Sequence, residues 1–173
     1  MNKLLKQIVA FLVEVTKELK KQTKLIEEIH ATVVGSSDTK SLADHAEDFL
    51  GTDASPADIA PDELGCAESV SMVIRKILPD FKIETATWLM KDQLDADSRF
   101  KRVTEAERDV IILSPTYSGN GTVVGHVGIF GGSERIMSNS STSGTWEYNY
   151  TLQKWVDYYR GKGGLKIYYY KLK

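Results

Sequence analysis

The sequence predicts an α+β protein in which helices pack on an antiparallel sheet, preceded by a long N-terminal helix. Helical patterns dominate the chain up to about residue 94 and β-rich segments follow Arg108, an order that is typical of α+β domains. Apolar residues in the first 34 positions recur at alternating spacings of three and four, which indicates one amphipathic helix. At 173 residues, with 42% hydrophobic and 27% charged residues, the chain fits one globular domain with an appendage.

The N-terminal helix is predicted over residues 1–34 and carries the a/d repeat of a coiled coil. Its apolar seam consists of Leu5, Ile8, Leu12, Val15, Leu19, Ile26, Ile29 and Val33, with Gln22 in the one polar slot. Three interpretations stay open: the helix packs on its own domain, self-associates into a homo-oligomer, or docks into a larger assembly. Residues 35–40 are expected to form a linker and residues 41–173 the globular domain.

Within that domain, apolar spacing predicts helices over residues 41–50, 66–78, 84–94 and 151–159. Gly51 and Pro79 end the first two of these helices. Strands are expected at residues 110–113, 122–130, 135–137, 146–150 and 165–170, where β-branched and aromatic residues gather. A Gly-Gly pair at residues 131–132 is expected to form the turn of a hairpin.

Charge and cysteine content exclude several classes of function. The formal net charge is −2, so neither nucleic acid nor anionic lipid is an expected partner. The apolar stretch at residues 8–13 is far shorter than the roughly 20 residues that a membrane span needs, and no signal peptide is expected. A single cysteine excludes an internal disulfide and a multi-thiolate metal site.

That cysteine, Cys66, occupies the first turn of a predicted buried helix. A helix N-terminus offers unpaired N–H groups and a partial positive charge. Both are expected to lower the pKa of the thiol and favour the nucleophilic thiolate. The same N–H groups can stabilise the oxyanion of a tetrahedral intermediate. Cys66 is therefore the candidate nucleophile, against the alternative of a small buried apolar residue.

His126 is the candidate base among the three histidines of the chain. It lies in an apolar, glycine-containing strand, whereas His30 lies on the N-terminal helix and His45 in a charged helix, and both are expected to be solvated. An imidazole within a core strand costs free energy unless its nitrogens are satisfied. The flanking Gly125 and Gly128 are expected to leave room for substrate around the ring. Asn139 follows on the adjacent strand of the hairpin, where its amide is expected to orient the imidazole.

Three segments together resemble the NlpC/P60 and CHAP cysteine peptidases. They are Leu-Gly-Cys-Ala-Glu-Ser-Val at residues 64–70, Arg-Asp-Val-Ile-Ile at residues 108–112 and Gly-His-Val-Gly-Ile-Phe at residues 125–130. The resemblance covers roughly residues 41–173 and implies a papain-like fold with a Cys66, His126 and Asn139 triad. The sequence departs from many members by having Gly65 and Ala67 around the cysteine and by lacking a tyrosine shortly before it. Asp53, Asp58 and Asp62 are too scattered to form the calcium loop of some CHAP domains.

The resemblance implies a peptidoglycan hydrolase that cuts amide bonds of the cell wall, either within stem peptides or between N-acetylmuramic acid and L-alanine. No metal or cofactor is expected for this chemistry. Trp88 and Trp146 are candidates for the wall of a substrate groove, with core packing as the alternative for each. The ending around residues 136–146 resembles phage-encoded members, so delivery by a holin or as part of a virion is expected. Two alternatives stay open: a structural virion component on the same fold, or another acyl-transfer enzyme such as a transferase or deamidase.

Overall fold

The computed structural model describes residues 11, 12, 14–26 and 40–173. The chain divides into two units, Met1–Thr39 and Lys40–Lys173. In the first unit the described residues are helical, and the rest of the predicted helix over residues 1–34 lies outside the described residues. The described part of the seam is solvent-exposed at Leu12, Val15, Leu19 and Ile26. Among the described residues, no helix has the length and apolar character needed to cross a membrane.

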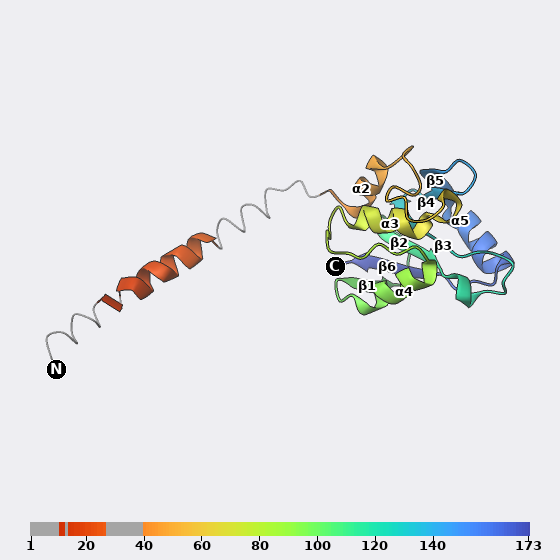
Figure 1. Ribbon diagram of the computed structural model, residues 1–173. Helices are drawn as coiled ribbons and strands as arrows, with labels where there is room; N and C mark the ends of the chain where they lie inside the picture. The colour runs from red at the N-terminus through yellow and green to blue at the C-terminus, as the bar shows by residue number, and fades with distance from the viewer. Residues whose placement is uncertain (1–10, 13, 27–39) are drawn as a thin grey trace. The chain divides into compact units, whose positions relative to one another are not determined.

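The second unit is an α+β domain, as predicted (Figure 1). Its helices are α2 (Leu42–Asp48), α3 (Cys66–Ile74), α4 (Thr87–Ala96) and α5 (Leu152–Trp155), with short 3-10 turns η1 (Asp62–Leu64) and η2 (Thr116–Ser118) and a π-helical turn η3 (Val156–Lys162). Its strands are β1 (Phe100–Val103), β2 (Val110–Ser114), β3 (His126–Gly132), β4 (Arg135–Ser140), β5 (Thr145–Thr151) and β6 (Tyr168–Leu172).

The six strands form one antiparallel sheet in the order β1-β6-β2-β3-β4-β5. Strand β2 lies at the centre and is buried along its whole length, which explains its unbroken apolar run. Its neighbour β3 pairs with it through Leu113 opposite Val127 and Ser114 opposite His126. His126 is therefore the first residue of its strand and lies at one end of the sheet.

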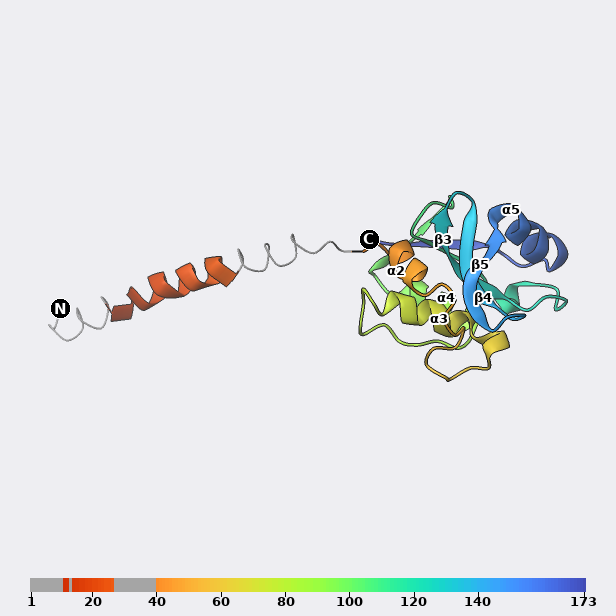
Figure 2. The same cartoon turned by 90° about the horizontal axis from the view of Figure 1, so that it is seen from above.

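Side chains alternate between the two faces of the sheet, and each face has its own core. On one face, Leu113, Val127 and Ile129 join the core formed with α2, α3 and α4. On the other face, Ile112 and Phe130 join Trp155 and Tyr159 of α5 and η3. Figures 1 and 2 show the sheet between these two groups of helices, with α5 on the side opposite α3.

The structure corrects three predicted elements. Residues 122–125 precede the strand instead of extending it, because the Gly125 N–H donates to the Thr116 side-chain oxygen at 2.9 Å, not to a neighbouring strand. Strand β1 was missed, since its exposed Lys101 and Arg102 hide the apolar alternation. The predicted helix over residues 151–159 becomes π-helical after Trp155, where the Gly163 N–H bonds the carbonyl of Tyr158.

Candidate active site

Cys66 begins α3, as predicted, and Gly65 is the residue at the helix N-cap. The loop before the helix passes so close that a Cβ on Gly65 would lie 2.5 Å from the carbonyl oxygen of Ala54. Any larger residue would push this loop away from the helix. Gly65 is thus required by the close approach of the backbone, and it fixes where the first turn of α3 begins.

A buried glutamate, Glu68, holds the same loop, a role that the sequence reasoning missed. Its carboxylate accepts hydrogen bonds from the hydroxyl of Ser55 at 2.8 Å and from the N–H groups of Ala57, Ile59 and Ala60 at 2.7, 3.2 and 2.8 Å. The Ser69 hydroxyl donates to the carbonyl of Ala54. Residues 65, 68 and 69 share one helix face, so the loop is attached along that face. A lone glutamate inside an otherwise uncharged helix was the signal that could have revealed it.

The thiol of Cys66 is mostly buried, with 7% of the residue exposed. Burial raises its pKa to about 11, while the backbone N–H groups of Val127, Ala67 and Cys66 itself lower it only in part. The expectation of a lowered thiol pKa is therefore wrong: the helix N-terminus acts in the predicted direction, but desolvation is the larger effect. The contact with Val127 places the sulfur beside the residue that follows His126.

His126 packs against aromatic rings from the other face of the sheet. Its ring stacks on Trp155 and Tyr159, with centroids 5.3 and 5.7 Å away, and meets Tyr150 edge-on at 5.7 Å. Burial lowers the pKa of His126 to about 4, and a hydrogen bond with the backbone of Asn139 opposes this shift. Its buried Nε2 has no hydrogen-bond partner among the described residues. The imidazole is consequently neutral near pH 7 and has a nitrogen left for a reaction partner.

The glycines beside His126 serve chain packing, contrary to the expectation that they make room for substrate. A Cβ on Gly125 would lie 2.4 Å from the Ser114 carbonyl oxygen and 2.4 Å from the Thr116 nitrogen. A Cβ on Gly128 would lie 2.6 Å from the carbonyl oxygen of Met137. Both glycines permit close approach of neighbouring backbone segments, and so they fix the position at which β3 starts.

Asn139 reaches the same region, but its amide does not make the predicted contact with His126. Its Nδ2 donates to the Asp62 carbonyl oxygen at 2.9 Å, and its buried Oδ1 has no partner among the described residues. The register of β3 and β4, with Ile129 opposite Met137, continues to place Asn139 opposite Val127. Its side chain therefore lies on the α3 face of the sheet, whereas the imidazole lies on the α5 face. The backbone of Asn139, not its amide, bonds the ring.

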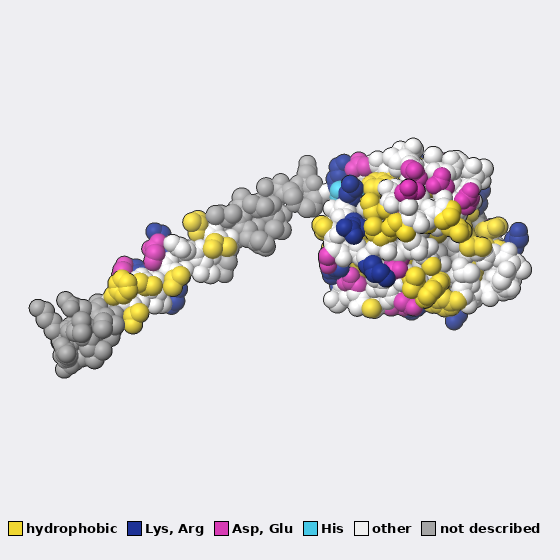
Figure 3. Space-filling view, viewed as in Figure 1, with side chains coloured by type: hydrophobic (Ala, Val, Ile, Leu, Met, Phe, Trp, Pro, Cys, Tyr) yellow, Lys and Arg dark blue, Asp and Glu magenta, His cyan; other side chains and the backbone are white. Residues whose placement is uncertain are grey.

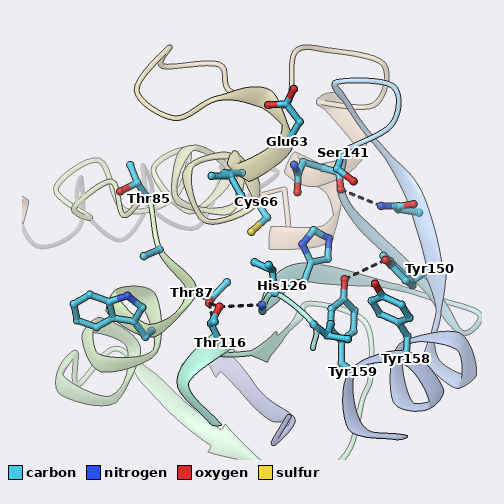
Figure 4. Close-up of a pocket in the computed structure, with 18 of the residues that line it drawn as sticks. Glu63, Cys66, Thr85, Thr87, Thr116, His126, Ser141, Tyr150, Tyr158 and Tyr159 are labelled. Carbon is cyan, nitrogen blue, oxygen red and sulfur yellow. Dashed lines mark hydrogen bonds between the residues drawn. The ribbon is translucent and has the colours of Figure 1, made fainter. Parts of the chain in front are cut away.

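Cys66 and His126 both line a pocket of about 560 Å³ at the end of the sheet where β3 begins. Figure 4 shows the thiol and the imidazole projecting into it from α3 and from the sheet, with Tyr150, Tyr158 and Tyr159 beyond the imidazole. The Tyr159 hydroxyl donates to that of Tyr150 at 3.0 Å. This tyrosine cluster could not be predicted from the sequence, because its members come from β5 and from a π-helical turn.

The two predicted substrate-contacting tryptophans have different positions. Trp88, at the start of α4, lines the pocket and is 44% exposed. Trp146 is fully buried in the core under α2, where its indole N–H donates to the carbonyl of Ala46 at 2.9 Å. The groove-wall prediction for Trp146 is therefore wrong and its core-packing alternative holds.

His45 lies near Asp48, with Nδ1 4.0 Å from a carboxylate oxygen, and is not among the residues that line the pocket.

The depressed pKa of His126 predicts a pH-dependent loss of stability. Its value of about 4 lies below the ordinary 6.5, so the unfolded chain binds a proton more readily than the folded one. Stability contributed by the neutral ring is complete above pH 6.5 and is lost as the pH falls toward 4, by roughly 3 kcal/mol. Urea unfolding measured between pH 7 and 4 is expected to show this slope in the wild type and not in His126→Gln. Equal slopes in both proteins would contradict the buried, neutral imidazole.

Comparison with known proteins adds no identification: the sequence matches no protein-family model and no curated protein. Within the described part of the chain, no group of three or more His, Cys, Asp or Glu side chains is arranged to hold a metal ion. The site is thus defined by its own geometry: a thiol at a helix N-terminus and a neutral imidazole from the end of a central strand, sharing one pocket.

Proposed function

We propose that the domain is a cysteine hydrolase of papain-like architecture that cuts amide bonds of bacterial peptidoglycan. One observation carries the proposal: Cys66, the only cysteine of the sequence, and His126 line the same pocket. Cys66 lies in the first turn of α3, and His126 lies at the start of β3. A helix that begins with the nucleophile and packs on a sheet that supplies the base is the arrangement that the resemblance to NlpC/P60 and CHAP peptidases implies.

The chemistry follows from the groups around the sulfur. The substrate's carbonyl carbon is attacked by Cys66 Sγ as His126 takes the thiol proton, and the carbonyl oxygen becomes an oxyanion near the backbone N–H groups that act on the sulfur. The C–N bond then breaks, and the leaving amine takes the proton from His126. Water, deprotonated by the same imidazole, attacks the thioester and releases the carboxylate and the free thiol.

The resting pair is neutral, because the thiol pKa is raised to about 11 and the imidazole pKa is lowered to about 4. Proton transfer therefore accompanies attack and does not precede substrate binding. The imidazolium that forms is stabilised by the faces of Trp155 and Tyr159, which attract a cation. The backbone of Asn139 accepts from the ring and holds it in place.

Cell wall as the substrate is supported by the motifs at residues 64–70, 108–112 and 125–130 and by their resemblance to wall-cutting peptidases. The resemblance to phage-encoded members points to action at the wall after release by a holin or as part of a virion. Purified walls treated with the full chain are expected to lose turbidity and release new amino groups. Iodoacetamide, which can alkylate no cysteine other than Cys66, is expected to block both changes.

Two other outcomes of this assay would overturn the proposal. Intact walls after prolonged treatment would favour a structural component of a virion on the same fold. Products extended by an added amine, in place of free carboxylates in mass spectra, would favour a transferase. Neither outcome is expected, because the thiol and the imidazole line the same pocket, where a bound substrate can reach both.

We further propose that the N-terminal helix joins copies of the chain. Leu12, Val15 and Leu19 are three and four residues apart, Ile26 follows Leu19 by seven residues, and all four are exposed, as expected of a seam that a second copy covers. Replacing Leu12 and Leu19 together by aspartate places charges in that seam and is expected to yield a monomer in sedimentation of the full chain. The matched change of Lys17 and Lys20 to aspartate, off the seam, should leave the oligomer intact. A monomeric wild type would refute self-association.

A further inference from the structure

Strand β5 contains a β-bulge beside the pocket. Ile136 of β4 lies opposite Tyr150, whereas the next residue, Met137, lies opposite Tyr148. Asn149 is therefore an extra residue of β5, without a counterpart in β4. A bulge of this kind disturbs the local alternation of side chains and can turn one of them toward a site.

The bulge brings Asn149 and its neighbour Tyr150 to the same pocket. In a regular strand the side chains of successive residues point to opposite faces, so one of the two would be directed away. Tyr150 meets the ring of His126 edge-on, with centroids 5.7 Å apart, and lies beside it in Figure 4. The bulge thus adds a carboxamide to the pocket without removing the tyrosine from the imidazole.

The carboxamide of Asn149 contacts the carbonyl oxygen of Asn139. Its Nδ2 donates to that oxygen at 3.0 Å. The backbone of Asn139 also bonds the ring of His126 in a way that favours the protonated ring, so the carbonyl is the acceptor there as well. Because Nε2 of the ring has no partner among the described residues, the bonded ring nitrogen is Nδ1. One carbonyl oxygen therefore accepts from both side chains, within its capacity of two lone pairs.

The strands leave this carbonyl to side-chain donors. Trp146 of β5 lies opposite Asn139, but its N–H and its carbonyl bond the loop at residues 51–52, each at 2.9 Å. On the other side, the paired residues of β3 and β4 end at Met137, before Asn139 is reached. The direction of the Asn139 carbonyl therefore depends on the side chains that donate to it, and Asn149 is one of them.

The neutral imidazole has two tautomers, and only one of them can act as proposed. With the proton on Nδ1, the lone pair of Nε2 is free to take the thiol proton. The stacked rings of Trp155 and Tyr159 fix the plane of the imidazole but do not distinguish its two nitrogens. An acceptor at Nδ1 makes that distinction, and its bond to the ring becomes stronger when the ring gains a proton.

Resting on the proposed hydrolysis, we propose that Asn149 is a positioning residue, which keeps the Asn139 carbonyl directed at Nδ1 of His126 and so keeps Nε2 free as the base. Asn149 acts through this carbonyl and not on the substrate. The side chain of Asn139, which was predicted to orient the ring, instead donates to the Asp62 carbonyl oxygen at 2.9 Å. A backbone carbonyl and a second asparagine thus take the place of the amide that the resemblance implies.

Nitrogen NMR of the full chain with labelled histidine measures the tautomer directly and needs no substrate. The signals of His126 are identified by their loss in His126→Gln, and the wild type at pH 7 is expected to hold the proton on Nδ1. Asn149→Leu replaces the carboxamide by an apolar group of similar size, and Asn149→Ala removes it without added bulk. Each is expected to shift the tautomer ratio toward Nε2–H by about fivefold, as for the loss of one net hydrogen bond.

The kinetics of wall hydrolysis give a second measurement. In both Asn149 variants the maximal rate should fall by about fivefold, while the wall concentration at half-maximal rate should stay within about twofold of wild type. Hydrophobic side chains gather over α3 and α4 on the face shown in Figure 3, and Trp88, at the start of α4, is 44% exposed and lines the pocket. Trp88→Ala is expected to give the opposite pattern: a higher half-maximal concentration and an unchanged tautomer.

Gln153→Leu is the matched control for the loss of a carboxamide donor. Its Nε2 donates to the Asp157 carboxylate at 2.8 Å, and Gln153 lies four residues after Asn149, is exposed and does not line the pocket. Neither the tautomer ratio nor the rate of hydrolysis should change. An effect equal to that of Asn149→Leu would mean that any such loss loosens the domain, and the positioning role would be overturned.

The possible failures are distinguishable. A wild-type ring with its proton on Nε2, or a tautomer ratio that both Asn149 variants leave unchanged, overturns the positioning role even where walls are cut. A shifted tautomer with an unchanged maximal rate overturns it as well. Walls that stay intact under the wild type remove the hydrolase proposal alone, because the tautomer is measured without substrate and its shift still supports control of the ring by Asn149.

Discussion

Replacing Cys66 by alanine is expected to lower the rate of wall hydrolysis by on the order of 10⁴-fold or more, because no other thiol in the chain can form the acyl-enzyme. Cys66→Ser is expected to be almost as inactive: a hydroxyl is far less acidic than a thiol, and a site that already raises the thiol pKa to about 11 disfavours an alkoxide still more. Both changes are small in volume, so thermal unfolding should shift by only a few degrees.

Burial of the thiol also predicts how the rate of its alkylation depends on pH. Because the thiol pKa is raised to about 11, alkylation of the wild type by iodoacetamide should be slow at pH 7 and should accelerate up to pH 11. The rate of wall hydrolysis should not show this dependence on pH, because His126 takes the thiol proton during the attack. Lysis that persists in Cys66→Ala would show that the thiol is not the nucleophile, and rapid alkylation at pH 7 would show that the helix N-terminus outweighs desolvation.

The positions of Cys66 and His126 could be predicted because each depends on local chemistry. A cysteine preceded by glycine and followed by an apolar stripe begins a helix, and a histidine among glycines and β-branched residues lies in a strand. That they share a pocket followed from their chemistry together with the resemblance to known peptidases. The order of helices and strands was also sufficient to predict an antiparallel sheet covered by helices.

The contacts that could not be predicted depend on strand register and on loops. A shift of one residue moves a side chain to the other face of a sheet, and the register of β3 and β4 places Asn139 on the face away from His126. Trp146 lies opposite Asn139 in β5, so it points into the core under α2. Aromatic character alone carries no information about which face a residue takes.

Desolvation is the second limit of sequence reasoning at this site. The sequence shows that Cys66 begins a helix, but it does not show how much protein covers the sulfur. Part of that cover comes from a segment distant in sequence, since the backbone of Val127 in β3 contacts the thiol. The pKa direction of the thiol is therefore a property of the packed structure.

Replacing Glu68 is expected to produce a large loss of stability. Its carboxylate is fully buried and accepts hydrogen bonds from four donors of the loop before α3. In Glu68→Gln, the amide nitrogen would face one of these donors and leave it unpaired. The expected loss in unfolding free energy is about 2–4 kcal/mol, as for a buried hydrogen-bonded charge that loses its partners. Glu68→Leu leaves the three N–H donors unpaired, whereas the Ser55 hydroxyl keeps the Ala60 carbonyl as its acceptor, and this change should cost more.

The free energy of unfolding is to be measured with urea at pH 7, with Glu63→Gln as the matched control. Glu63 lies in the same segment and is exposed, so the same change of charge there should alter stability by less than about 0.5 kcal/mol. The loop held by Glu68 leads directly into η1, whose residues Glu63 and Leu64 line the pocket. Glu68→Gln should therefore also raise the KM of the protein that remains folded. Stability within 0.5 kcal/mol of wild type would mean that the loop keeps its conformation without this carboxylate, and the wall of the pocket would then need another support.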